Sequence, residues 1–93
     1  MQRKDLIPGR YYHLPVGEFS ARIFFLDEIN SDYLVVSFIL RRDHVNTFIY
    51  PLKGAHRWCT YDGDYRELTL EELEWTRACQ RANKILPNKP ETI

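Results

Sequence analysis

Short apolar runs separated by turn-forming residues fill the first two thirds of the chain. Runs of this length, rich in β-branched and aromatic residues, are typical of β-strands. Turns are expected at residues 8–9, 15–18 and 30–32, where proline, glycine, asparagine, serine or aspartate gather. The pattern predicts strands at residues 10–14, 21–27, 33–40 and 45–50, and a short fifth strand at 65–68.

The run from Tyr33 to Leu40 is the strongest of these strands, and it is apolar on both of its faces. Such a strand is covered on both sides, or it bends through the wall of a barrel. Arg41-Arg42-Asp43-His44 is predicted to form a polar hairpin tip after it. Pro51 is predicted to end the returning strand, because proline cannot donate to a ladder, and residues 53–64 are expected to be irregular.

A helix is predicted over residues 69–86. Thr69 is an N-cap with Glu72 three residues later, the capping-box pattern, and Pro87 stops the helix. Its apolar stripe runs through Trp75, Ala78, Cys79, Ala82, Ile85 and Leu86. Leu70 and Leu73 lie off this stripe, so the first turn either inserts between two parts of the protein or presents two leucines to a partner. Residues 87–93 are expected to form a loose tail.

Ninety-three residues with 44% hydrophobic content suit a single domain spanning 1–93, with strands over about 6–68. Thirteen basic and thirteen acidic residues give zero net charge, which argues against a strongly basic nucleic-acid binder. The N-terminal residues have no apolar core of a signal peptide, and the longest apolar stretch, residues 34–40, is far too short for a membrane span. Cys59 and Cys79 could form one disulfide, but two widely spaced cysteines outside a C-x-x-C pattern are better interpreted as reduced thiols. Reduced thiols and a cytoplasmic location are therefore expected.

Several motifs lie within residues 6–68: Pro8-Gly9-x-Tyr11-Tyr12, the paired runs 21–28 and 33–41, the Arg41-Arg42-Asp43-His44 tip and Tyr50-Pro51-Leu52. Together they resemble a small SH3-like barrel of the Tudor or KOW type. The resemblance implies a mainly β fold of four to five antiparallel strands with one C-terminal α-helix. The alternative is an α+β arrangement, in which an antiparallel sheet carries the helix on one face.

Patterns that would indicate catalysis or a bound cofactor are absent from the sequence. His56 and Cys59 form one close pair, whereas zinc needs about four converging ligands and a thiol nucleophile needs an oriented base. Asp62-Gly63-Asp64 lacks the remaining ligands of a calcium loop and is interpreted as a turn. No glycine-rich phosphate loop occurs. We therefore expect no enzyme activity, no cofactor and no metal.

The residue types that dominate binding surfaces are abundant instead. The tyrosine and tryptophan content exceeds what a small core requires, and arginine outnumbers lysine nine to four, which favours recognition of carboxylates or phosphates. The predicted binding residues are Arg41, Arg42, His44, Tyr11, Tyr33, Trp58, Tyr61, Leu70 and Leu73.

Mixed charge, abundant Tyr, Trp and Arg and the absence of catalytic patterns predict a non-enzymatic interaction module that binds another protein. Single-domain chains of this kind are often adaptors, or inhibitors carried by phages and other mobile elements. The alternative is nucleic-acid binding through Arg41, Arg42 and exposed aromatic residues, by analogy with KOW- and Tudor-like barrels. Neutral net charge weakens this alternative, because affinity for phosphates comes largely from released counterions. The sequence leaves the oligomeric state open.

Overall fold

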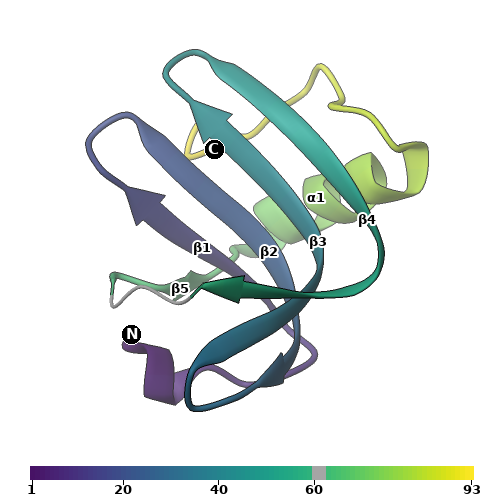
Figure 1. Ribbon diagram of the computed structural model, residues 1–93. Coiled ribbons are helices and arrows are strands. Elements are labelled where there is room, and N and C mark those ends of the chain that lie inside the picture. The colour runs from purple at the N-terminus through teal and green to yellow at the C-terminus, as the bar shows by residue number, and fades with distance from the viewer. Residues whose placement is uncertain (60–62) are drawn as a thin grey trace.

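Five antiparallel strands form one sheet in the order β4-β3-β2-β1-β5, and a single helix follows them in the chain (Figure 1). The computed structural model describes residues 1–59 and 63–93, with the backbone alone for residues 51–53 and 59. The elements are η1 (Arg3–Asp5), β1 (Tyr11–Val16), β2 (Ser20–Ile29), β3 (Tyr33–Asp43), β4 (Asn46–Cys59), β5 (Arg66–Glu67) and α1 (Leu70–Ala82). The predicted fold class, mainly β with one C-terminal helix, is confirmed.

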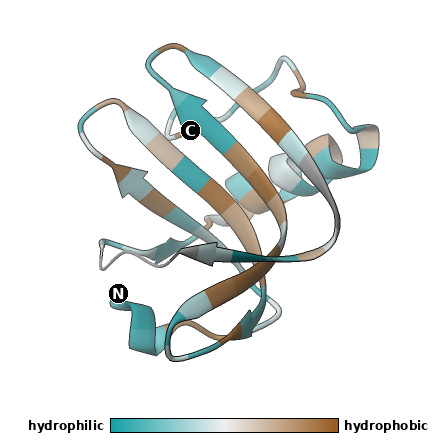
Figure 2. Ribbon diagram, in the orientation of Figure 1, coloured by the Kyte–Doolittle hydropathy of each residue, from teal (hydrophilic) through white to brown (hydrophobic). Residues whose placement is uncertain are grey.

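Two apolar cores lie on the opposite faces of this sheet. The central strands are therefore apolar on both sides, and Figure 2 shows hydrophobic residues concentrated along them. The inner core lies on the face turned away from α1 and consists of Leu6, Tyr12, Leu14, Phe24, Leu26, Leu34, Val36 and Tyr65. The outer core lies between the sheet and α1 and consists of Ile23, Phe38, Leu40, Trp75, Cys79 and Ile93. The open sheet is thus bent around one core and covered by a helix over the other, which fits both sequence alternatives.

β3 contributes to both cores because it contains a bulge. Residues with even numbers face one side of the sheet before the bulge and the other side after it. Phe38 pairs with Phe25 of β2. The next residue of β2, Leu26, pairs with Val36, which leaves Ser37 as an extra residue. As a result Leu34 and Val36 belong to the inner core, whereas Phe38 and Leu40 belong to the outer core.

β4 continues through Pro51 to Cys59, so the prediction that it ends at Pro51 is wrong. The pair that flanks a two-residue hairpin turn, here Asp43 and Asn46, is hydrogen-bonded, and such pairs alternate along the ladder. By this alternation Pro51 faces Phe38 at a non-hydrogen-bonded position. The missing N–H would have pointed away from β3, so the proline costs no ladder bond on this edge strand. After it, residues 52–55 have no partners in β3 and include Gly54 at φ 77°.

The two arginines predicted at the hairpin tip lie within β3 instead. The turn consists of residues 44–45, where His44 has a φ of 49°. Because side chains alternate along a strand, Arg41 and Arg42 point to opposite faces of the sheet. Likewise, β1 includes Pro15 and Val16, which were predicted to lie in a loop.

The helix begins as predicted. The hydroxyl of Thr69 accepts a hydrogen bond from the Glu72 backbone N–H at 3.2 Å, and the Glu72 carboxylate accepts one from the Thr69 N–H at 2.8 Å. The helix ends at Ala82, earlier than the predicted residue 86. Asn83 adopts the left-handed conformation there, at φ 56°, and its N–H caps the carbonyls of Cys79 and Gln80.

The C-terminal residues are packed against the protein, which corrects the expectation of a loose tail. Ile93 is 3% exposed and belongs to the outer core. The Thr92 hydroxyl donates a hydrogen bond to Glu72 Oε2 at 2.6 Å, and Lys89 Nζ lies 3.4 Å from Thr47 Oγ1. These contacts hold the end of the chain over the same sheet face as α1.

The N-terminal residues pack against the inner core. The Met1 ammonium group donates to the Tyr65 carbonyl at 2.5 Å, and Tyr65 N–H donates to the Met1 carbonyl at 3.1 Å. Leu6 is buried in the inner core, and the hydroxyl of Tyr12 accepts a hydrogen bond from the Ile7 N–H. Among the described residues, no helix is long and apolar enough to cross a membrane.

Candidate functional site

The sheet face opposite α1 is uncovered in its upper part, and we call this region the open face (Figure 1). It presents two arginines side by side, because Arg22 of β2 pairs with Arg41 of β3. Asp43 lies one step along the same face and contacts both: its Oδ2 is 2.6 Å from Arg41 Nε and its Oδ1 is 3.3 Å from Arg22 Nη1. The open face therefore carries an arginine pair bridged by one carboxylate.

This carboxylate stays ionised. Desolvation would raise the pKa of Asp43, but the Ser20 hydroxyl, Arg41 and Arg22 together hold its pKa below the usual value. The Arg41 side chain is 45% exposed and that of Arg22 only 16% exposed. Arg41 is therefore the cation of this cluster that is accessible to a partner.

A cleft of about 260 Å³ lies beside the arginine pair. Its remaining walls are apolar and aromatic: Ile39 from β3, and Tyr50 and Trp58 from the two halves of β4. Trp58 is held in place by Phe24 of the inner core, edge-on at 5.0 Å between ring centroids. Pockets for small molecules usually measure about 300–1,000 Å³ and are largely enclosed. This cleft is smaller and suits a single side chain of a larger partner.

Exposed apolar side chains gather around the same end of the sheet. Among the described residues, five of the eight large hydrophobic side chains that are exposed belong to β1, β4 or the two turns at this end. Phe19 and His44 stack at 6.1 Å and join these turns to each other. The five side chains are Val16 (37% exposed), Phe19 (58%), Val45 (87%), Phe48 (44%) and Tyr50 (44%). A cluster of this kind on a small protein is typical of an interaction site.

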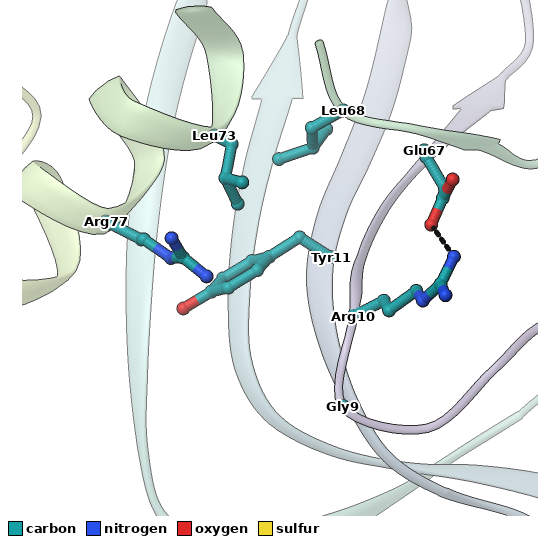
Figure 3. Close-up of a pocket in the computed structure, with 7 residues that line it drawn as sticks. All are labelled: Gly9, Arg10, Tyr11, Glu67, Leu68, Leu73 and Arg77. Atoms are coloured by element: carbon teal, nitrogen blue, oxygen red, sulfur yellow. Dashed lines mark hydrogen bonds and ion pairs between the residues drawn. The ribbon is translucent and has the colours of Figure 1, made fainter. Parts of the chain in front are cut away.

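A second cleft, of about 240 Å³, lies between α1 and the start of β1 (Figure 3). Arg10 donates to Glu67 at 2.7 Å on one side, and the guanidinium of Arg77 lies over the Tyr11 ring at 5.8 Å on the other. The Tyr11 hydroxyl donates to the side-chain oxygen of Gln80. None of the residues that line this cleft is among the large hydrophobic side chains that are exposed, whereas Tyr50 at the open face is, so the open face is the stronger candidate site.

Charged and polar residues under α1 serve the fold. Both carboxylate oxygens of Glu72 bond Arg66, at 2.6 and 2.8 Å, and Glu72 is fully buried. These bonds outweigh desolvation and lower its pKa to about 2. His13 is 7% exposed, and neither of its ring nitrogens has a hydrogen-bond partner. Desolvation, with the nearby cations of Arg66 and Arg42, lowers the pKa of His13 to about 4.

Metal-binding clusters and the thiol of Cys79 were the remaining candidates for chemistry among the described residues. No group of three or more His, Cys, Asp or Glu side chains converges there in a way that could hold a metal ion. The buried thiol of Cys79 is free and accepts the Leu86 N–H, and desolvation raises its pKa. A thiol in such surroundings is a poor nucleophile.

The predicted binding residues do not form one site. Arg41 and Trp58 meet at the cleft of the open face. Arg42 is half-buried on the helix side, and its Nε has no partner. His44 lies in the turn, and Tyr33 packs under Arg57 at 4.7 Å. Tyr11 and Leu73 line the cleft beside α1, whereas Leu70 is 71% exposed on the helix. Tyr61 lies outside the described residues.

Several residues of the open face were not among the predicted binding residues, including Arg22, Phe48 and Tyr50. The sequence contains a signal for the last two, because Phe48 and Tyr50 alternate with Thr47 and Ile49 and so share a face. Arg22 becomes part of the site only through its pairing with Arg41, which the register between two strands decides.

Comparison of the chain with protein-family models, with curated proteins and with solved structures gives no match. The function is therefore inferred from the open face itself.

Proposed function

We propose that this chain is a non-enzymatic binding module that recognises another protein through the open face. The observation that carries the proposal is the exposed pair Phe48 and Tyr50 beside Arg41 and the cleft that Trp58 lines. Aromatic residues and arginine dominate the energetics of protein interfaces, because they bury a large area and also hydrogen-bond. An adaptor or an inhibitor, including one carried by a phage or another mobile element, acts through a surface of this kind.

The arrangement suggests how a partner would bind. An apolar side chain of the partner fits the cleft between Tyr50 and Trp58, with Ile39 as its floor. A carboxylate of the partner reaches Arg41, whose guanidinium can bond it in a bidentate manner. The surrounding aromatic residues then exclude water from these contacts.

Binding of nucleic acid is the less favoured alternative because the two arginines that suggested it diverge. Arg42 lies on the helix side of the sheet, and Asp43 offsets part of the charge of Arg41 and Arg22. The electrostatic contribution that dominates affinity for nucleic acids is therefore small on this face.

Two further expectations belong to the proposal. An SH3-like relationship is supported by the strongly bent sheet of five antiparallel strands. A reducing, cytoplasmic setting is supported by the free thiol of Cys79, which is buried in the outer core.

Site-specific photo-cross-linking tests the proposal. A benzophenone amino acid in place of Tyr50 should capture a protein from a native lysate treated with nuclease. The same probe in place of Leu70, which is more exposed but lies on the helix, serves as the control. Equal capture at both positions would argue against the open face, and capture that nuclease abolishes would favour the nucleic-acid alternative.

Affinity for the captured partner then measures the contribution of the site. Replacing Arg41 by Ala, or Phe48 by Ser, should weaken binding at least tenfold, equivalent to about 1.4 kcal/mol. Leu70→Ser should leave the affinity unchanged. An interface of this kind should also show only a shallow dependence on salt, in contrast to the steep loss expected for contacts with phosphates.

A further inference from the structure

At residues 46–50, the part of β4 next to the turn, the outer strand edge pairs with no other described strand. β4 lies at one end of the strand order and pairs with β3. In the described part of the chain, residues 46–50 make no backbone hydrogen bond outside that ladder. Unpaired strand edges are templates for the addition of a further strand.

The register identifies the groups that point outward. Hydrogen-bonded pairs alternate from the pair that flanks the turn, so Phe48 and Tyr50 bond β3 through their backbone. Thr47 and Ile49 occupy the positions between, and their N–H and C=O groups point away from the sheet. Each chain thus offers two donors and two acceptors along this edge.

Protection of the sheet edges is uneven. The opposite edge, β5, is two residues long, and both residues are charged. Beyond Pro51, β4 is interrupted by residues that have no partners in β3. Residues 46–50, Asn-Thr-Phe-Ile-Tyr, contain neither charge nor proline and are rich in strand-forming types. Natural sheets usually blunt such an edge with charges, proline or a bulge, so this stretch is suited to pairing.

We propose that this edge pairs with the same edge of a second copy of the chain, antiparallel about a two-fold axis at Phe48. In this register Thr47 faces Ile49 of the other copy, and the outward donors and acceptors at both positions are satisfied. With two N–H groups from each copy, four hydrogen bonds form, and none requires the N–H that Pro51 lacks. The two Phe48 rings lie opposite each other at the axis, where aromatic pairs stabilise neighbouring strands.

A second copy fits this edge better than an unrelated strand for two reasons. The stretch without charge is centred on Phe48, so its length and hydrogen-bonding groups match those of its own copy when the two run antiparallel. The chain also has zero net charge, so two copies approach without overall repulsion. Pairing would place two open faces next to each other and give a bivalent surface.

Self-association and its geometry can be measured together. We expect sedimentation velocity to show monomers at low micromolar concentration and dimers as the concentration approaches millimolar. Amide hydrogen exchange by NMR should show Phe48 and Tyr50 protected at every concentration. Protection of Thr47 and Ile49 should appear only as dimers form. A chain that stays monomeric throughout, or a dimer in which Thr47 and Ile49 still exchange rapidly, would overturn the proposal.

A charge swap at the axis tests the symmetry. Phe48→Glu places two carboxylates opposite each other in the dimer, while in the monomer the introduced carboxylate would face Arg41 and leave the fold intact. This variant and Phe48→Lys should each dimerise at least tenfold more weakly than the parent chain, and a mixture of the two should recover a heterodimer. Leu70→Glu, a matched change on the helix, should dimerise like the parent. Failure of the mixture to associate would exclude an axis at Phe48.

Discussion

The two faces of the sheet differ in how far other parts of the chain cover their side chains. On the helix face, α1 and the C-terminal residues cover the outer core, and the buried carboxylate of Glu72 has partners from three segments: Arg66, Thr69 and Thr92. On the open face, Phe48 and Tyr50 remain 44% exposed beside a cleft. We propose that recognition belongs to this region, whereas the inner core and the helix face provide stability, so substitutions should separate the two.

The largest effect is expected from the buried carboxylate. Glu72→Gln removes the charge that Arg66 and Thr92 bond, and leaves these groups poorly matched. We expect a loss of about 3 kcal/mol in the free energy of unfolding, at the low end for a broken buried ion pair because Arg66 remains 39% exposed. Urea denaturation at pH 7 measures it.

Glu67→Gln is the matched control, because Glu67 also pairs with an arginine, Arg10, but has 44% of its side chain exposed. The exposed pair should contribute little to stability, so the urea midpoint of Glu67→Gln should stay at the parental value. Equal losses for the two variants would mean that burial does not distinguish the pairs.

The second effect is a pH dependence from His13. Its pKa in the folded protein, about 4, lies below its ordinary value of 6.5, so the unfolded chain binds the proton more readily. The stability from this residue is complete above about pH 6.5 and is lost as the pH falls to about 4. This difference in pKa corresponds to a loss of about 2 kcal/mol by pH 5. Glu72, with a pKa of about 2, adds a separate loss between about pH 4.5 and 2.

His13→Leu isolates the first pH window. Neither imidazole nitrogen has a protein partner, so an apolar side chain at this position removes no hydrogen bond. The variant should be at least as stable as the parent at pH 7, and its stability should not change between pH 6.5 and 5. An unchanged slope in this range would show that another group titrates there.

The third effect concerns the Thr69 cap at the start of α1. Thr69→Ala removes the hydroxyl that accepts the Glu72 N–H at 3.2 Å. Loss of a helix N-cap typically costs about 0.5–2 kcal/mol, and we expect about 1 kcal/mol here. Thermal denaturation of Thr69→Ser, which keeps the hydroxyl, should match the parent chain, whereas a parental midpoint for the alanine variant would show that the cap is dispensable.

Local patterns predicted the parts of this fold that depend on neighbouring residues. The approximate positions of the strands and the Thr69 cap follow from residue types within a few positions of each other, and these predictions agree with the structure. Two of the predictions that failed depend on distant segments. Pro51 lies within a strand because β4 is an edge, and Ile93 is buried because α1 and the sheet leave a place for it.

The candidate site shows the same division. The sequence predicted that Arg41 and Trp58 are binding residues, but only the register brings them to one cleft. Arg41 and Arg42 were predicted to act together at a hairpin tip. Because the turn consists only of residues 44–45, both arginines lie in β3, where alternation directs them to opposite faces. Alternation shows that Phe48 and Tyr50 share a face. This face is uncovered because α1 packs on the other side of the sheet, and local patterns do not predict on which side a helix packs.

The smallest effect on stability is expected on the open face, and it separates the two sides most directly. Phe48 and Tyr50 belong to neither core, so replacing both by Ser should change the free energy of unfolding by no more than about 0.5 kcal/mol. Ile49 lies between them on the same strand but packs against the outer core, so Ile49→Ser should cost more than about 1 kcal/mol. Urea denaturation of both variants at a concentration low enough to keep the chain monomeric makes the comparison. If the double variant is destabilised as much as Ile49→Ser, the exposed aromatic residues support the fold, and the separation between a structural face and a recognition face does not hold.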